Sequence, residues 1–412
     1  MPFLDLQQLD IDHKTVLVRL DLNVPLDEEG NITEDSRIIA SLPTLQHLLD
    51  RNAKVVLMTH MGRPKGQDPK LSTLNVGKRI SRMLFREVKH INQCVGNDVK
   101  QTIKAMKPGE ILLLENLRFF EGEKKNDPQF VKQLAELADV YVNECFGVSH
   151  REHASMYGLP KLLPGAGGFC LRKEVDTLNK MMQNPKHPFV AVLGGVKADK
   201  MDVLKNLLPK VDQVLIGGGL AMLISKLQGK NVGSSKFDDE WMTEDMQKRL
   251  KEVIQHPDFV KKVILPEDCI VAQECKSDVP TKAVDKDSIE DGWMALDIGP
   301  KTREHFKSIL EKAQTIMWAG PMGVFEIDQF AEGTKMVAKA MASSKGLTVV
   351  GGGQSGMAIE QFNLADRVTH VSTGGGAFLH FVSYGSLPGI DVLTNFKEQS
   401  QQKQRMEMQT IF

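Results

Sequence analysis

Short β-rich apolar runs alternate with longer amphipathic stretches along this chain, and that alternation limits the possible folds more than any other feature. It is typical of parallel sheets, because the crossover helices that link successive parallel strands cover both faces of the sheet. The sequence therefore predicts an α/β fold built on parallel strands. The runs are residues 15–20, 53–59, 110–114 and 139–143 in the first half, and 189–193, 213–216, 262–265, 315–318, 347–350 and 367–371 in the second.

Chain length and one helical stretch indicate two domains. The chain has 412 residues, more than a single hydrophobic core usually supports, since domains commonly span about 100 to 200 residues. Residues 171–182 have helical periodicity, with Leu171, Val175 and Leu178 on one face, and a proline-rich stretch follows. We therefore expect a first domain at 1–170, a connecting helix at 171–186 and a second domain at 187–386.

Composition argues against several classes of protein. With 41% hydrophobic residues, 25% charged residues and a formal net charge of -1, the chain lacks the basic excess that drives nonspecific nucleic-acid binding. Its start resembles no signal peptide, and no apolar run approaches the roughly 18 residues of a membrane span. The five cysteines form no CxxC pair, which favours neither a disulfide framework nor a zinc site. We expect a cytoplasmic protein that binds neither nucleic acid nor membranes.

Polar and cationic residues follow the apolar runs of the first half. Open parallel sheets bind ligands beyond the carboxyl ends of their strands, and arginine binds carboxylate and phosphate groups through a planar fork of donors. Any one of these residues could be a solvated charge or a structural group, but their recurrence after four runs predicts a pocket for a small, multiply charged anion. They are Asp21, Asn23 and Arg37, then His60 and Arg63, then Arg118, and finally Asn143, His150 and Arg151.

Glycines follow the apolar runs of the second half instead. A glycine turn between a strand and a helix lets phosphate oxygens approach backbone N–H groups at the positive end of the helix dipole. The alternative is that these glycines serve only tight turns and close packing. The segments are Leu193-Gly-Gly, Ile216-Gly-Gly-Gly, Gly320-Pro-Met-Gly, Val350-Gly-Gly-Gly and Thr373-Gly-Gly-Gly.

Two common nucleotide motifs fit poorly. The series Gly351-x-Gly353-x-x-Gly356 has the dinucleotide spacing but lacks the acidic residue expected about 20 residues later, so an NAD-dependent oxidoreductase is not favoured. No P-loop motif is found in the sequence. An anion pocket on one domain and a phosphate site on the other together predict phosphoryl transfer, in line, in a cleft that closes. Such chemistry depends on positioning and charge neutralisation.

Six ordered motifs carry a resemblance to one known family. They are Arg19-Leu-Asp-Leu-Asn-Val-Pro, His60-Met-Gly-Arg-Pro, Leu114-Glu-Asn-Leu-Arg-Phe, Asn143-Glu-Cys-Phe-Gly-Val-Ser-His-Arg, Gly320-Pro-Met-Gly-Val-Phe-Glu and Ser372-Thr-Gly-Gly-Gly-Ala. Through them the chain closely resembles the phosphoglycerate kinases along nearly its whole length.

The resemblance implies two Rossmann-like lobes, each a parallel sheet with helices on both faces, joined by a hinge helix. It also implies that residues 387–412 return to the first lobe. The implied reaction is reversible transfer of the acyl phosphate of 1,3-bisphosphoglycerate to ADP, with Mg²⁺ as cofactor, giving 3-phosphoglycerate and ATP. No general base is needed, because in the ATP-consuming direction the nucleophile is a carboxylate that is already ionised at neutral pH. We expect a monomer.

Site residues follow from the same resemblance, position by position. Catalytic roles fall on Arg37, which stabilises the transferring group, and on Lys200, Gly353 and Gly375. The phosphoglycerate pocket comprises Asp21, Leu22, Asn23, Arg37, His60, Met61, Gly62, Arg63, Arg118 and Arg151. The nucleotide pocket comprises Lys197, Lys200, Gly217, Gly218, Pro321, Val324, Glu326 at the ribose, Gly352, Gly353, Gln354 and Ser355.

Three departures from the family pattern fall on the nucleotide side. Gln354 replaces the aspartate that binds magnesium, which predicts a weak metal ligand, since a neutral amide oxygen binds a hard cation less well than a carboxylate does. Ala319 replaces an asparagine near the phosphates, and the segment from Lys197 to Lys200 is one residue shorter than the family pattern. These departures leave one alternative open, a family member with weakened catalysis and a binding or regulatory role.

Overall fold

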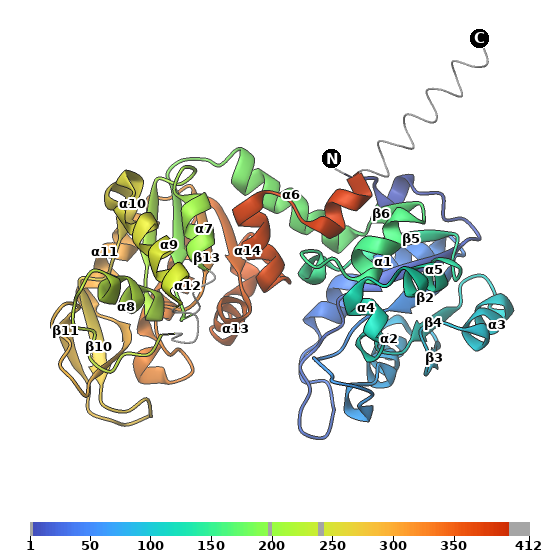
Figure 1. The fold of residues 1–412 in the computed structure, drawn as a ribbon, viewed down its shortest axis with the longest axis horizontal. Coiled ribbons are helices and arrows are strands. Elements are labelled where there is room, and N and C mark those ends of the chain that lie inside the picture. Colours follow the sequence, from blue (N-terminus) through green and yellow to red (C-terminus); the bar gives the residue numbers. More distant parts are fainter. Residues whose placement is uncertain (1–2, 197–199, 238–242, 395–412) are drawn as a thin grey trace, which may run out of the picture. The chain divides into compact units, whose positions relative to one another are not determined.

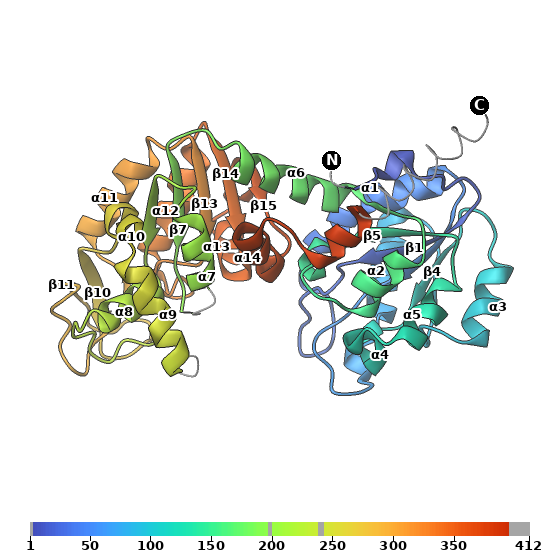
Figure 2. The same cartoon turned by 45° about the horizontal axis from the view of Figure 1, so that its top comes forward.

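The computed structural model describes residues 3–196, 200–237 and 243–394. The chain divides into two compact units, one of Met1–Asp176 with Ser386–Phe412 and the other of Thr177–Gly385. Each unit contains a six-stranded sheet, and Figures 1 and 2 show helices on both faces of each. The predicted α/β architecture of two parallel sheets covered by helices is confirmed.

The first sheet has the order β3-β4-β2-β1-β5-β6, and all of its pairings are parallel. Strands β2, β3 and β4 all lie on one side of β1, and β5 and β6 lie on its other side. The strand order therefore reverses at β1. The strands are β1 (Thr15–Leu20), β2 (Lys54–Met58), β3 (Val88–Ile91), β4 (Ile111–Leu114), β5 (Val140–Glu144) and β6 (Gly165–Gly167). The helices include α1 (Ser36–Asp50), α2 (Leu74–Leu84), α3 (Asn97–Ala105), α4 (Glu121–Lys125) and α5 (Pro128–Ala135).

Burial on both faces explains why the central strands of this sheet are mostly apolar. Val16, Val18 and Leu20 of β1 pack in one core with Ile38 and Leu45 of α1. Side chains alternate along a strand, so the residues between them face the opposite side, where they are equally buried. The strand faces therefore have no room for ligands, which leaves the strand ends.

The second sheet has the order β15-β14-β13-β7-β8-β9, also fully parallel. Trp318 of β13 is fully buried in its core. The strands are β7 (Phe189–Leu193), β8 (Gln213–Ile216), β9 (Val263–Ile264), β13 (Thr315–Ala319), β14 (Leu347–Gly351) and β15 (His370–Val371). The helices are α7 (Lys200–Leu207), α8 (Gly218–Leu227), α9 (Glu244–Gln255), α10 (Pro257–Lys262), α11 (Pro300–Leu310), α12 (Glu332–Ser343), α13 (Gly353–Gln361) and α14 (Gly375–Tyr384).

Several strands were not predicted. The second unit also contains an antiparallel sheet of β10 (Asp268–Ala272), β11 (Lys282–Asp285) and β12 (Met294–Ile298), in the order β11-β10-β12. Strand β11 begins and ends with a charged residue, and β3 is only partly buried, so neither gives a continuous apolar run. Strand β6 is Gly-Ala-Gly, a sequence without strand propensity.

A long helix, α6 (Phe169–Gln183), contains the passage from one unit to the other, which falls between Asp176 and Thr177. Its first turn is held by Glu144, a fully buried carboxylate that accepts hydrogen bonds from the backbone N–H groups of Cys170 and Leu171. Thr44 adds its hydroxyl, which donates to Glu144 over 2.6 Å. Burial raises the pKa of Glu144 to about 7.

Residues that follow the second unit in sequence pack on the first. The Gly389 N–H donates to the Ser149 carbonyl over 2.9 Å, and the Asn143 side chain donates to the Gly389 carbonyl over 3.3 Å. The glutamine-rich tail, 395–412, lies outside the described residues. Among the helices of the described residues, none is both long and apolar enough to cross a bilayer.

Candidate functional site

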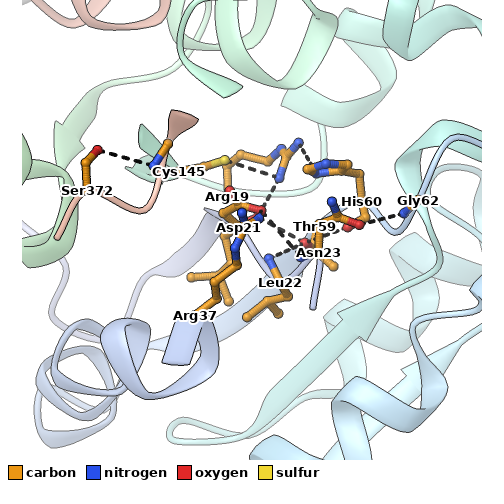
Figure 3. A network of polar contacts seen from close by, with 12 residues as sticks. Arg19, Asp21, Leu22, Asn23, Arg37, Thr59, His60, Gly62, Cys145 and Ser372 are labelled. Carbon is orange, nitrogen blue, oxygen red and sulfur yellow. Dashed lines mark hydrogen bonds and ion pairs between the residues drawn. The ribbon is translucent and has the colours of Figure 1, made fainter. Parts of the chain in front are cut away.

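The residues predicted to bind an anion lie at the carboxyl edge of the first sheet, close to the point where the strand order reverses. Arg37 is in the first turn of α1, and Arg118 lies in a short turn after β4. Figure 3 shows several of these side chains in one network. The others follow β1 (Asp21, Leu22, Asn23), β2 (His60, Met61, Gly62, Arg63) and β5 (Arg151).

Hydrogen bonds join the strand ends to one another. Asn23 Oδ1 accepts from the Gly62 N–H over 2.7 Å, and Arg118 Nη1 donates to the Gly62 carbonyl over 2.6 Å. Gly62 has φ of 58°, a left-handed conformation that favours glycine. Arg37 Nη1 lies 2.9 Å from Asp21 Oδ1. The loops after β1, β2 and β4 thus form one connected structure with Arg37 and Arg118 on it.

Four predicted residues take less part in this network. The side chains of Leu22 and Met61 are buried, and their N–H groups donate to Thr59 Oγ1 over 3.0 Å and to Asn116 Oδ1 over 3.1 Å. Arg63 and Arg151 are exposed, and across the described ranges no hydrogen bond or ion pair is found for their side chains. Each nevertheless lies close enough to act electrostatically, because Arg63 helps to lower the pKa of Arg118 and Arg151 that of His153.

Arg19 is a buried charge beside the candidate site that the sequence analysis did not single out. Its side chain is fully buried inside β1, where Nε donates to Ser155 Oγ over 2.9 Å and Nη2 lies 3.3 Å from His60 Nδ1. Ser155 in turn donates to the buried carboxylate of Glu123 over 2.6 Å, which places an anion one hydroxyl away from the Arg19 charge. Its only sequence signal is an arginine within an apolar strand.

The same arginine fixes the state of His60. Arginine has only donors, so His60 Nδ1 must accept and the proton of the neutral ring must lie on Nε2. Burial, together with the charges of Arg19 and Arg118, holds the pKa of His60 well below its usual range. His60 is therefore a neutral hydrogen-bond donor in a positively charged site. Burial and the same two arginines lower the pKa of nearby His153 to about 4.

A pocket of about 410 Å³ lies in the second unit. Its described lining includes Gly195, Val196 and Gly219 beside the ends of β7 and β8, and apolar side chains from α8, β10 and β12, among them Met222, Cys269 and Leu296. Of the residues predicted to bind nucleotide, it brings together Gly218, Pro321, Val324, Glu326 and Gln354.

The glycines beside this pocket have different reasons to be glycine. A Cβ on Gly351 would meet the ring of Phe378, and a Cβ on Gly217 would come 2.6 Å from Met322 Sδ, so these two serve packing. Gly352 has φ of 91°, whereas a Cβ on Gly353 would meet no atom within 4 Å. The packing interpretation is thus confirmed for Gly351 and Gly217, whereas phosphate binding at the open Gly353 stays a prediction.

Two helices begin side by side at Gly353 and Gly375. Helix α13 starts at Gly353 and α14 at Gly375, and a Cβ on Gly375 would come 3.1 Å from the Gly353 nitrogen. The first N–H groups of a helix have no partner within it, and the helix dipole favours an anion there. The paired starts of α13 and α14 therefore form a structure suited to binding phosphate.

Two other predicted nucleotide ligands hold the surrounding loops. Lys200 is buried, and its ammonium group donates to the Gly194 carbonyl. Ser355 is fully buried and accepts a hydrogen bond from the Gly320 N–H, which joins α13 to the loop after β13. Lys197 lies outside the described residues.

A family model described as phosphoglycerate kinase matches residues 6–384. The chain belongs to the phosphoglycerate kinase family. Curated phosphoglycerate kinases include one from Moorella thermoacetica, 49% identical over 96% of this chain and 100% of its own length, and one from Aquifex aeolicus, 48% identical over 93% and 96%. These matches support the kinase and transferase reading rather than the alternative of a binding role.

Solved structures of phosphoglycerate kinases have the same fold. The structure from Coxiella burnetii is 37% identical, with a TM-score of 0.83, and the structure from Pyrococcus horikoshii is 33% identical, with a TM-score of 0.84. Each comparison covers 96% of this chain and 99% of the other. The two-unit architecture is therefore that of the family.

The neutral state of His60 predicts how this site responds to pH. Because the folded protein disfavours the proton, His60 contributes stability above its unfolded pKa, near 6.5, and that contribution is lost as pH falls toward the folded pKa. We expect the His60 ring signals in a two-dimensional NMR titration to stay constant from about pH 8 to pH 5.5, because the ring stays neutral over that range. A His60 inflection near pH 6.5 would contradict this assignment.

Proposed function

We propose that this chain transfers the acyl phosphate of 1,3-bisphosphoglycerate to ADP, reversibly, giving 3-phosphoglycerate and ATP. The observation that carries the proposal is the similarity to phosphoglycerate kinases over nearly the whole chain. A coupled assay with glyceraldehyde-3-phosphate dehydrogenase tests it, with turnover expected in both directions. Absence of turnover in folded protein would contradict it.

The first unit binds the phosphoglycerate in this proposal. Its ligands are Asp21, Leu22, Asn23, Arg37, His60, Met61, Gly62, Arg63, Arg118 and Arg151. Arg118 and Arg37 supply charge, and the neutral His60 supplies an Nε2 proton to a carboxylate or phosphate oxygen. Because Asn23 and Arg118 already hold the main chain of Gly62, the pocket is organised before the anion arrives.

The second unit binds the nucleotide. The apolar side chains from α8, β10 and β12 would contact the base, and Glu326 would accept hydrogen bonds from the ribose. The phosphates would lie at the paired starts of α13 and α14, where Gly352 and Gly353 leave the backbone open and Gly375 lets the two helix starts approach each other. Gly217, Gly218, Pro321 and Val324 shape the pocket, Ser355 joins α13 to the loop after β13, and Lys197 and Lys200 are the candidate phosphate lysines.

The chemistry needs charge neutralisation rather than a general base. A carboxylate of 3-phosphoglycerate is already a nucleophile at neutral pH, so the residues that matter are those facing the charge on the transferring group. Arg37 has that role here, assisted by Gly353, Gly375 and Lys200. Arg37 pairs with Asp21 over 2.9 Å, which orients its guanidinium group before substrate binds.

Magnesium would be held mainly by the nucleotide. Within the described residues, no group of three or more His, Cys, Asp or Glu side chains could hold a metal ion. Gln354 lines the pocket, and its Oε1 lies 3.5 Å from where a Cβ on Gly195 would be. One amide oxygen fits a cation whose other ligands are phosphate oxygens and water, and the cation would supply charge neutralisation on the phosphates. A monomeric, cytoplasmic protein completes the proposal.

Arg37→Ala is expected to lower kcat by about 100-fold or more, because the charge on the moving phosphoryl group loses a fixed partner. Steady-state rates in the coupled assay measure this. Arg82→Ala, which removes an exposed arginine of α2 outside the network, is the control and should keep full activity. A rise in KM alone would assign Arg37 to ground-state binding.

Gly353→Ala and Gly351→Ala separate phosphate binding from packing. The Gly353 variant adds a methyl group that meets no protein atom, so its melting temperature should stay within about 2 °C of the parent. Its kcat/KM for ADP should nevertheless fall by about tenfold or more, since the methyl group obstructs the approach of phosphate. Gly351→Ala should melt earlier, because the added Cβ meets the Phe378 ring. Unchanged kinetics for Gly353→Ala would remove that residue from the phosphate site.

Gln354→Asp should lower the magnesium concentration needed for half-maximal rate, because a carboxylate binds a hard cation better than an amide does. Titration of magnesium at fixed ADP measures it. Gln354→Asn has the same shortened side chain without the charge and should raise the requirement or leave it unchanged. Equal behaviour of the two variants would show that side-chain length, not charge, sets the requirement.

A further inference from the structure

Lys236 is the one cationic side chain among the described residues that line the pocket of the second unit. Most of the lining residues are apolar or glycine, and the lining contains two carboxyl side chains, those of Asp297 and Glu326. A lysine beside a mostly apolar pocket is unusual and could interact with a ligand there. Within the described part of the chain, no ion pair joins its ammonium group to a carboxylate, and the residue is exposed.

The main chain holds Lys236 at a defined place beside the pocket. The preceding residue, Ser235, is buried, and its hydroxyl accepts a hydrogen bond from the N–H of Ala295 in β12 over 2.9 Å. The Lys236 carbonyl lies beside Gly219, where an added Cβ would come 2.9 Å from it. Lys236 is thus fixed between the first turn of α8 and strand β12, and both elements line the pocket.

The part of the pocket beside Lys236 suits the base of a nucleotide better than its phosphates. The apolar side chains that could cover a purine come from α8, β10 and β12, including Met222, Cys269 and Leu296. The open helix starts suited to phosphate are at Gly353 and Gly375, and neither of these residues lines this part of the pocket. A lysine between α8 and β12 therefore approaches the base.

The other charged side chains cannot replace Lys236 in reading the base. Asp297 Oδ2 accepts from the Gly333 N–H over 2.7 Å, and its Oδ1 is buried from solvent and has no hydrogen-bond partner. Neither oxygen is available to a ligand. Glu326 is an acceptor when ionised and suits hydroxyl groups, as the proposed function assigns.

Purine bases differ in what they offer to an ammonium donor. Guanine presents two acceptors, O6 and N7, on one edge, whereas adenine presents N7 beside the donor group at N6. Hypoxanthine carries the same O6 and N7 pair as guanine. An ammonium group that reaches this edge therefore interacts better with a 6-oxopurine than with adenine.

We propose that Lys236 contacts the base edge and makes this nucleotide site accept guanine and hypoxanthine nucleotides alongside adenine nucleotides. The inference rests on the proposed function, because it takes the pocket to be the nucleotide site. It names a specificity-determining residue and the class of ligand that this residue favours, the 6-oxopurine nucleoside diphosphates.

The test compares ADP, GDP and IDP in the parent and in Lys236→Met, which keeps a long apolar side chain without the donor. We expect the ratio of kcat/KM for GDP to that for ADP to fall by about tenfold in Lys236→Met, the scale of one good hydrogen-bond contact to a base edge. IDP should follow GDP, since both carry O6. Lys236→Arg should preserve the ratio, and Lys312→Met, an exposed lysine outside the pocket, should not change it.

Binding measurements keep this inference distinct from the proposed function. Titration calorimetry of each diphosphate gives Kd without turnover, and Lys236→Met should weaken GDP and IDP about tenfold more than ADP. Absence of turnover with all three nucleotides, while they still bind with this pattern, would contradict the proposed reaction and support the inference. An unchanged GDP-to-ADP ratio in both kcat/KM and Kd would overturn the role of Lys236.

Discussion

Burial of both faces of a parallel sheet decides where this protein can do chemistry. Val16 to Leu20 are buried along the whole of β1, and the central strands of the second sheet are covered just as completely. A ligand therefore finds no free face on either parallel sheet, and backbone groups become accessible where strands end and helices begin. The first candidate site is built from side chains at such an edge, and the second combines backbone at an edge with apolar side chains from α8, β10 and β12.

Arg19 departs from that rule, since it carries a charge within a buried strand. Such a charge is tolerated only when its donors are satisfied and an anion lies nearby. Ser155 links it to Glu123, and His60 takes another of its donors. The buried Arg19 in this way holds the His60 ring, which is itself buried, and fixes which ring nitrogen carries the proton.

Sequence reasoning recovers the parts of the fold that have long, uniform patterns. The central strands, such as β1 and β13, are mostly apolar, so their positions and their parallel arrangement were predictable. Strand β11 has only two apolar residues between two charged ones, and β6 consists of glycine and alanine, so nothing in either segment marks it as a strand before its pairing is known. Local composition cannot supply that information.

The residues of the candidate sites also differ in how far the sequence could place them. Residues that directly follow a strand, such as Asp21 and His60, could be placed at the sheet edge from their position alone. The roles of Arg19 and Lys236 depend on what packs beside them in three dimensions, which no spacing rule gives. The glycine segments lie between these cases, because the sequence marks them but only the surroundings distinguish Gly351, pressed against Phe378, from the open Gly353.

The hydrogen bond from Arg19 also determines which ions the first site can admit. A histidine coordinates a divalent metal through the lone pair of an unprotonated ring nitrogen. In His60 one nitrogen receives the arginine proton and the other carries its own, so the ring has no lone pair to offer. The His60 ring therefore offers no ligand to a divalent metal, and the arginines around it favour an anion at this edge of the sheet.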